Sequence, residues 1–282
     1  MNSAPLSTIE AKKMRDYSVA KSNELIIRSK YDLNVVEQRI LACMISTLDS
    51  RPREKGGNDK DVLAGELSID TFCELCNIEK RGSSKYILAL VKNIRDRSFW
   101  FETSKGEYET ISWLDKANYS ENKGTISFKF SSDVKSYLLN LDEDFTTYKL
   151  PMVLRFDSRY ANLIYDLIQA KFGRSYKAPS SLVMSVDEIR QRVQVERFDK
   201  KTNKFKVVNQ NINFKDIRTK ILEPAVKEIN MYTDIIVDLS YVKKGRKVDT
   251  IQFTFRAKTK DEMSEIPPFV EKAARQEEEA SG

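Results

Sequence analysis

The stretch Asn211–Asn230, which reads NINFKDIRTKILEPAVKEIN, decides how the rest of the chain is interpreted. Its apolar residues recur at spacings of three and four, which predicts a helix with one buried face. That face consists of Ile217, Ile221, Leu222, Ala225, Val226 and Ile229. The opposite face carries Asn, Lys, Arg and Thr side chains, which hydrogen-bond to base edges and phosphates in DNA complexes. We interpret the stretch as a DNA recognition helix, and the alternative is an ordinary amphipathic surface helix.

Pro224 stands inside this predicted helix. A proline within a helix removes one backbone hydrogen bond, and its ring clashes with the preceding turn. We therefore expect the helix to kink or divide at Pro224, with base contacts before it and core packing after it. Because Asn can pair bidentately with adenine and Arg with guanine, the predicted base-reading residues are Asn211, Asn213, Lys215, Arg218 and Thr219.

The formal net charge of +6 is concentrated in the second half of the chain. Between Arg190 and Lys220, basic residues far outnumber acidic ones, and a polyanion is the natural partner of such a run. The residues predicted to contact phosphate are Arg190, Arg192, Lys200, Lys201, Lys204, Lys206, Lys220, Lys243, Lys244, Arg246 and Lys247, joined in the first half by Lys80, Arg81 and Lys85. A solvated charged loop is the alternative for the lysines between 200 and 206.

The chain contains no histidine. This excludes Ser-His-Asp and Cys-His hydrolases, HExxH metalloproteases and the histidine-containing metal sites of nicking enzymes, and no P-loop motif is present. Cys73 and Cys76 form a C-x-x-C, but without a second pair we interpret them, like Cys43, as core residues. We expect a protein that is not an enzyme and that has neither a metal nor a cofactor.

Long apolar runs and a signal-peptide pattern are also missing, so we expect a cytoplasmic protein. Residues 1–13 are predicted to be disordered, and residues 259–282 are predicted to form an acidic disordered tail. The region between them is long enough for two domains.

Each half of this region has the order helix, strand, helix, helix, hairpin, which is typical of a winged helix-turn-helix. In the first half the elements are expected at 34–48, 62–67, 68–76 and 84–95, followed by strands at 99–103, 108–114 and 125–130 and a short helix at 133–141. In the second half they are expected at 157–172, 182–184, 186–193 and 211–230, followed by a hairpin of 235–242 and 248–256. We predict an α+β chain with one winged-helix domain over 14–141 and another over 142–258.

The two halves also resemble each other residue by residue. Ser68–Glu79 matches Ser185–Glu196 at a constant offset, with Ser, Asp and the final Glu identical and the apolar positions kept. Val91–Ile94 likewise matches Val226–Ile229 just before each hairpin. Ser-x-Asp helix starts are common, but agreement at both ends of the helix pair favours an internal duplication.

The first half is less basic and more aromatic than the second. We therefore expect the first domain to serve dimerisation and auxiliary DNA contact, and the second to be the main sequence-specific binder. The aromatic residues of the first hairpin region exceed what a small core requires, so some can serve a protein interface while others pack inside. They are Phe99, Trp100, Phe101, Tyr108 and Trp113.

Several segments between Met14 and Lys258 resemble the iteron-binding replication initiators of bacterial theta-replicating plasmids. The most specific of them is ILEPAVKEIN at the end of the opening stretch. The segments are Ala20–Ile26, Tyr148–Pro151, Ser158–Tyr165, Ser185–Arg190 and Ile221–Asn230.

The resemblance implies binding of repeated duplex DNA sites at a plasmid origin, origin opening, and recruitment of the host initiator and the replicative helicase. It also implies an equilibrium between monomers that initiate replication and dimers, joined through the first domain, that repress their own promoter. The residues alone leave two alternatives. The first is a tandem winged-helix transcriptional repressor without an origin function, and the second is an enzyme of the nicking class, against which the missing histidine counts strongly although tyrosines are plentiful.

Overall fold

The computed structural model describes residues 17–52, 62–76, 78–79, 82–172, 179–199, 204–209 and 211–267, and for residues 172, 195–199 and 204–208 it describes the backbone only. Lys80, Arg81, Lys200 and Lys201, together with the predicted disordered segment 1–13, lie outside these ranges. None of the helices within them has the length and hydropathy of a membrane span.

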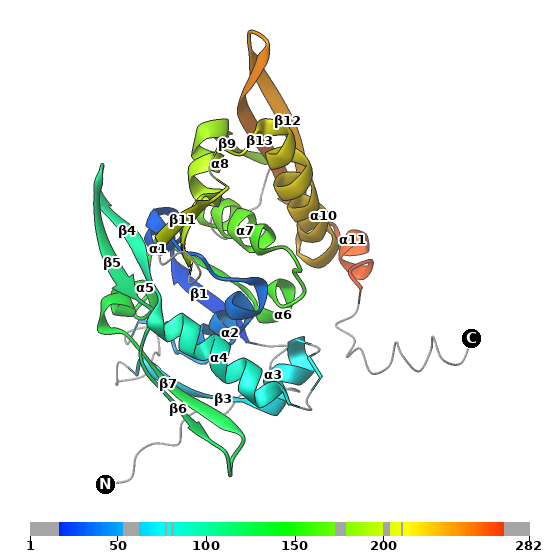
Figure 1. The fold of residues 1–282 in the computed structure, drawn as a ribbon. Helices are drawn as coiled ribbons and strands as arrows, with labels where there is room; N and C mark the ends of the chain where they lie inside the picture. The colour runs from blue at the N-terminus through cyan, green and yellow to red at the C-terminus, as the bar shows by residue number, and fades with distance from the viewer. Residues whose placement is uncertain are drawn as a thin grey trace.

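The first half forms helices packed on short antiparallel sheets (Figure 1). Its elements are β1 (Ser18–Ser22), α1 (Asn23–Arg28), β2 (Ser29–Lys30), α2 (Val35–Ser46), β3 (Ala64–Ser68), α3 (Ile69–Cys76), α4 (Ser83–Asp96), β4 (Ser98–Ser104), β5 (Glu107–Ser112), β6 (Leu114–Ser120), β7 (Thr125–Phe130), the 3-10 turn η3 (Ser132–Val134), α5 (Lys135–Leu138), β8 (Phe145–Lys149) and α6 (Leu150–Val153).

The second half repeats the helix, strand, helix, helix, hairpin order, with an extra hairpin inserted (Figure 1). Its elements are α7 (Arg159–Phe172), β9 (Ser180–Ser185), α8 (Val186–Val193), β10 (Val195–Asp199), β11 (Lys204–Val208), α9 (Phe214–Asp216), the π-helical segment η4 (Ile217–Leu222), α10 (Glu223–Tyr232), β12 (Ile235–Lys244), β13 (Lys247–Ala257) and α11 (Lys260–Ser264).

The two halves share one sheet topology. In each, the strand before the helix pair lies beside the second strand of the following hairpin, giving the orders β3-β7-β6 and β9-β13-β12. In both halves a serine caps the helix that follows this first strand: Ser68 Oγ accepts from Thr71 N at 3.2 Å, and Ser185 Oγ accepts from Glu188 N at 3.1 Å. The prediction of two related winged-helix domains in an α+β chain is confirmed.

The strand prediction for the first domain was incomplete. The segment 108–114 was expected to be one strand, but β5 ends at Ser112 and Leu114 begins a further strand, β6, in a different sheet. Trp113 and Leu114 are both buried, at 2% exposure each. Successive residues of a strand point to opposite faces, so two neighbouring buried side chains mark the place where the chain crosses from one sheet to the other.

The predicted domain boundary separates strands that the structure pairs. Residues 142–158 were assigned to the second domain, but β8 pairs with β1 from Ser18 opposite Lys149 to Ser22 opposite Phe145. Val19 and Tyr148, at 1% and 7% exposure, bury one face of this ribbon. Packing therefore attaches β8 to the first domain.

The predicted disordered tail contains a helix at its start. Thr259 Oγ1 accepts from Glu262 N at 3.3 Å and Glu262 accepts from Thr259 N at 2.8 Å, a capping box that starts α11. Both carboxylate oxygens of Glu262 accept from the Arg256 guanidinium at 2.7 Å, which holds the pKa of Glu262 down to about 2. Residues 268–282 lie outside the described ranges.

Helix α7 joins the two domains through a buried ion pair. Lys21 of β1 contacts Asp166 of α7 at 2.5 Å, and the hydroxyl of Tyr148 on β8 donates to the same carboxylate at 2.8 Å. At the rim, Arg159 contacts Asp32 at 2.5 Å. Helix α7 also packs against α10. The recognition element of the second domain is therefore anchored to the first domain through α7.

Lys21→Met should destabilise the protein by about 3–5 kcal/mol, because it leaves the Asp166 carboxylate buried without its counter-ion. Lys129→Met, which removes an exposed pair with Asp115, is the matched control and should cost less than about 1 kcal/mol. Urea unfolding of both variants measures the difference. Equal, small effects would show that the pair at Asp166 does not hold the domains together.

Candidate DNA interface

The predicted recognition helix is present but changes type along its length. It begins as α9, continues as the π-helical η4 and becomes the α-helix α10 at Glu223. Glu223 N donates to Arg218 O, five residues back. Such a wide turn lies directly before Pro224, which has no N–H to donate and whose ring would meet the carbonyl of Lys220 in an α-helix. The expected division at Pro224 is thus a change of helix type.

The back of this helix is buried as predicted. All six apolar residues expected on that face have exposures of 8% or less: Ile217, Ile221, Leu222, Ala225, Val226 and Ile229. Asn230 then attaches the helix to the wing, because its amide exchanges two hydrogen bonds with the backbone of Val237 on β12, at 2.9 and 2.7 Å. Core packing and this amide together fix the orientation of the helix relative to the wing.

The front of the helix presents cations. Lys215 and Lys220 are exposed, and Lys220 Nζ lies 3.1 Å from Asp216. The side chain of Arg218 is 43% exposed. The hydroxyl of Thr219 donates to Lys215 O at 2.9 Å, so it is used within the helix. Lys215, Arg218 and Lys220 are therefore the charged groups of this front that a DNA duplex would meet.

The two asparagines at the helix start have different roles. Asn213 is the N-cap: its Oδ1 accepts from Asp216 N at 2.9 Å and its Nδ2 donates to Asp216 Oδ2 at 3.2 Å. In the free protein both ends of its amide are therefore engaged within the start of the helix. Asn211 is exposed, with a φ of 58° in the left-handed region that asparagine tolerates, and its contact with a base stays a prediction.

Two of the predicted phosphate contacts face the protein. Arg190 Nε donates to Ile212 O at 3.1 Å, and the same guanidinium pairs with Asp187, so Arg190 holds the start of the recognition helix. Arg192 donates to Ile27 O of α1 at 2.9 Å, and burial lowers the pKa of its guanidinium. Arg192 is therefore a contact between the domains. A spacing pattern on α8 could not reveal either partner, because both arise from tertiary packing.

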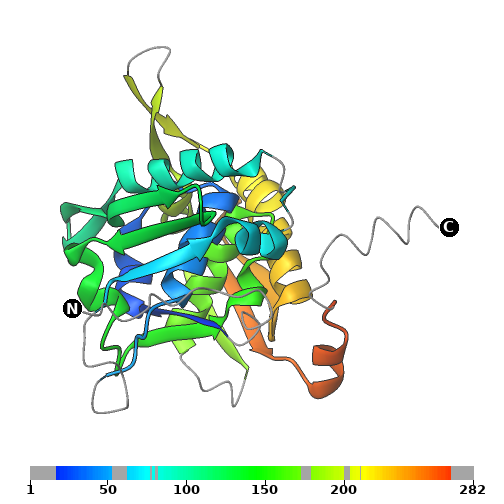
Figure 2. The same ribbon diagram turned by 90° about the horizontal axis from the view of Figure 1, so that it is seen from below.

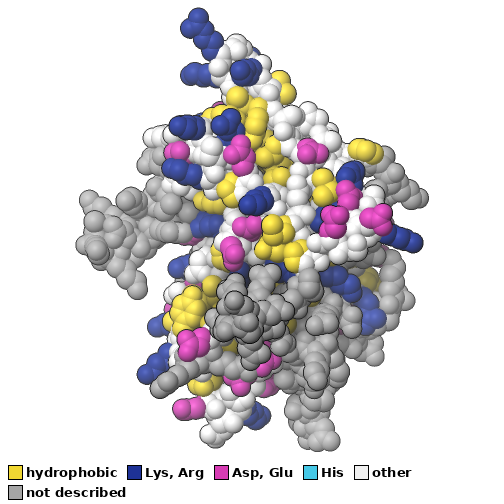
Figure 3. Space-filling view, turned by 90° about the vertical axis from the view of Figure 1, so that its right-hand side faces the viewer, with side chains coloured by type: hydrophobic (Ala, Val, Ile, Leu, Met, Phe, Trp, Pro, Cys, Tyr) yellow, Lys and Arg dark blue, Asp and Glu magenta, His cyan; other side chains and the backbone are white. Residues whose placement is uncertain are grey.

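The wing carries a compact cationic tip. Strands β12 and β13 pair as far as Lys244 opposite Lys247, and Gly245, with a φ of 64°, allows the tight turn between them. The wing projects beyond the body of the protein (Figure 1), and Lys and Arg side chains gather at this protruding end (Figure 3). The four residues predicted at the tip are all exposed: Lys243, Lys244, Arg246 and Lys247.

The remaining predicted cations are spread more widely. Lys85 is exposed near the start of α4, the first-domain counterpart of the recognition helix. Lys204 and Lys206 lie on β11, opposite Asp199 and Arg197 of β10. The β10–β11 hairpin extends away from the body (Figure 2), so the basic insert is a second projecting hairpin between α8 and the recognition helix.

Two residues beside Arg218, Glu223 and Tyr241, were not predicted from the sequence as part of this interface. Glu223 Oε1 lies 3.4 Å from Arg218 Nε, and Tyr241 of β12 packs edge-on against Phe214, with ring centroids 5.3 Å apart. Burial raises the pKa of the Tyr241 hydroxyl, and the Glu223 carboxylate raises it further. In an α-helix side chains three or four residues apart are neighbours, so only the π-turn brings positions 218 and 223 together.

The aromatic residues of the first domain divide into two groups. Phe99, Phe101 and Trp113 are buried at 3% exposure or less, whereas Trp100 and Tyr108 are 48% and 46% exposed. Lys30 lies 5.4 Å from the centre of the Tyr108 ring. Trp100 and Tyr108 are therefore the members of the set that are available for an interface.

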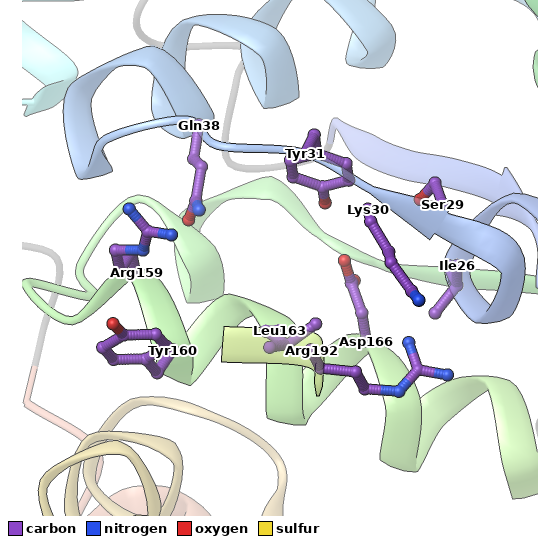
Figure 4. A pocket seen from close by; sticks show the side chains of 10 residues that line it. All are labelled: Ile26, Ser29, Lys30, Tyr31, Gln38, Arg159, Tyr160, Leu163, Asp166 and Arg192. Carbon is purple, nitrogen blue, oxygen red and sulfur yellow. The ribbon is translucent and has the colours of Figure 1, made fainter. Parts of the chain in front are cut away.

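A small pocket lies at the junction between the domains (Figure 4). Lys30, Tyr31 and Gln38 of the first domain line it together with Asp166 and Arg192. Its volume is about 30 Å³, which suits ordered water and is far below the several hundred Å³ of a typical ligand pocket. Among the described residues no group of His, Cys, Asp and Glu side chains is arranged to hold a metal ion, and Cys43, Cys73 and Cys76 are buried.

Comparison with known proteins agrees with this architecture. The PI protein of Escherichia coli is 29% identical over 176 residues, which cover 60% of this chain and 55% of that protein. The match thus spans about half of the relative's length. The crystal structure of Pi initiator protein in complex with iteron DNA superposes with a TM-score of 0.65 at 20% identity, covering 86% of this chain and 98% of that one, and supports the fold.

Two family models match in tandem, "Initiator Replication protein, WH1" over residues 18–169 and "Initiator Rep protein, WH2" over residues 185–255. WH1 includes β8, which agrees with the pairing of β8 with β1. WH2 includes α8, the recognition helix and the wing. The family expected from the sequence motifs is confirmed, and the chain belongs to the initiator replication protein family.

Proposed function

We propose that this chain is a plasmid replication initiator that binds repeated duplex sites at an origin through its second domain. One observation carries the proposal: a helix with a buried back and a cationic front is fixed by Asn230 beside a wing with four exposed cations at its tip. In winged-helix proteins the helix enters the major groove while the wing contacts the backbone. Family membership and the iteron complex of Pi initiator protein support the same proposal.

Within this proposal the roles divide by position. Arg218, Lys215 and Asn211 read base edges, and the wing tip grips the phosphates. Asn213 and Arg190 hold the start of the helix in place. The basic hairpin β10–β11 and Lys85 add phosphate contacts, the latter from the first domain.

The proposal extends to the activities that the family resemblance implies. The chain opens the origin, recruits the host initiator and the replicative helicase, and represses its own promoter as a dimer joined through the first domain. It acts in the bacterial cytoplasm without enzymatic activity of its own. The exposed Trp100 and Tyr108 support an interface on the first domain.

Arg218→Ala should lower affinity for the cognate repeat by about 10- to 100-fold and affinity for random duplex much less, because a bidentate contact from arginine discriminates guanine. Lys243→Ala should weaken binding to all duplexes about equally and reduce the salt dependence by about one phosphate contact. Arg95→Ala, which removes an exposed arginine of α4, is the control and should change neither. Equal loss on cognate and random duplex for Arg218→Ala would refute the assignment of base reading to Arg218.

Asn213→Ser should keep both the stability and the DNA affinity of the natural protein, because serine caps helices as well as asparagine does. Asn213→Ala should lose about 1 kcal/mol of stability by removing the cap. Thermal unfolding and fluorescence anisotropy on the cognate duplex measure the two effects. If Asn213→Ser bound the cognate repeat as weakly as Arg218→Ala, the amide would be a base reader after all.

Incubation of the purified protein with supercoiled origin plasmid and Mg²⁺ should leave the plasmid supercoiled, because the chain lacks the histidines of nicking enzymes. Agarose electrophoresis with a known nicking enzyme as a positive control reads the result. Accumulation of nicked circles in proportion to the protein would show that the initiator is an enzyme.

A further inference from the structure

Glu223 lies beside Arg218 on the exposed front of the recognition helix. The side chains of Arg218 and Glu223 are 43% and 50% exposed, and the π-turn places them one above the other through the bond from Glu223 N to Arg218 O. The two groups lie 3.4 Å apart without hydrogen-bond geometry, and Arg218 Nε is buried without a hydrogen-bond partner. The pair is thus a loose one in the free protein.

The surroundings of the carboxylate leave it free to accept hydrogen bonds. The neighbouring cation Lys220 is engaged with Asp216, and Lys227 is exposed one turn further along. Tyr241 faces the pair from the wing with a buried hydroxyl that has no hydrogen-bond partner. Among the described residues, Arg218 is the one cation within ion-pair distance of Glu223.

A carboxylate at this position would make the affinity for DNA depend on which bases the duplex presents. Phosphates repel it, and leaving it desolvated without a donor costs free energy. In the major groove the exocyclic amino group of cytosine is the donor that Glu accepts from, whereas guanine offers acceptors that suit Arg. A duplex with a suitably placed guanine and cytosine supplies partners for both Arg218 and Glu223. A duplex without them leaves the Glu223 carboxylate without a hydrogen-bond donor once DNA covers it.

We propose that Glu223 is a specificity-determining residue of the recognition helix: Arg218 leaves it for a guanine, and its carboxylate accepts from the amino group of a nearby cytosine. The inference rests on the proposed function, because it assumes that this helix enters the major groove. It assigns base reading to a residue after the π-turn, beyond the segment in which the sequence predicted it. The alternative is a purely structural role, in which Glu223 stabilises the start of α10 because a negative charge there interacts favourably with the helix dipole.

The test is binding-site selection from a library of randomised duplexes, followed by sequencing. The natural protein, Glu223→Ala, Glu223→Gln and Arg218→Ala are compared with Glu143→Ala, which removes an exposed carboxylate from the first domain. In Glu223→Ala the preference for cytosine over other bases should fall about 10-fold at one position, and the rest of the consensus should stay the same. Arg218→Ala should lose preference at a different position, a guanine. Glu223→Gln should shift the cytosine position toward adenine, the base that Gln pairs with bidentately.

The proposal would be overturned if Glu223→Ala and Glu223→Gln selected the same consensus as the natural protein. It would also be overturned if both variants gained affinity equally for every sequence, because that is the effect of removing a negative charge. Should Glu223→Ala fail to fold, as judged by circular dichroism, the nearly isosteric Glu223→Gln carries the same test. If the natural protein itself selected no consensus, the proposed function would fail as well. If Arg218→Ala lost the preference for guanine while the substitutions of Glu223 changed no preference, the proposed function would stand and only the role of Glu223 would be refuted.

Discussion

The arrangement of the two domains depends on the buried carboxylate of Asp166. A charge removed from water must be neutralised and hydrogen-bonded, or it destabilises the fold by several kcal/mol. Lys21 and Tyr148 supply the neutralising charge and the hydrogen bond, from paired strands at opposite ends of the first domain. They hold α7, which also packs on α10. The first domain and the recognition helix are therefore linked through α7.

The recognition helix itself is shaped by Pro224. A helix that must contain a proline either kinks or widens, and here it widens into a π-helical turn over Ile217–Leu222. The widening keeps the buried face continuous from Ile217 to Ile229. It also changes which side chains are neighbours on the front, and so pairs Arg218 with Glu223. A local backbone constraint thus determines the chemistry that the groove of a DNA duplex would meet.

Local signals predicted much of this fold. The capped helix Val186–Val193 has the bounds that were expected, because Ser185 and Glu188 form a capping box, and the apolar face of the recognition helix is buried as its spacing indicated. Long-range partners were not predictable from spacing. The pairing of β8 with β1 and the contact of Arg192 with Ile27 join residues far apart in the chain, and the pairing of Arg218 with Glu223 requires a rare helix type.

The most direct test of the account is a footprint of the purified protein on the DNA that flanks its own gene. A tandem winged-helix initiator whose second domain reads one repeat at a time predicts several protected sites of the same sequence at a regular spacing. These sites should lose protection together when Arg218 is replaced by alanine. Protection of a single inverted repeat alone would favour a repressor without an origin function, and protection without sequence preference would contradict base reading by the recognition helix.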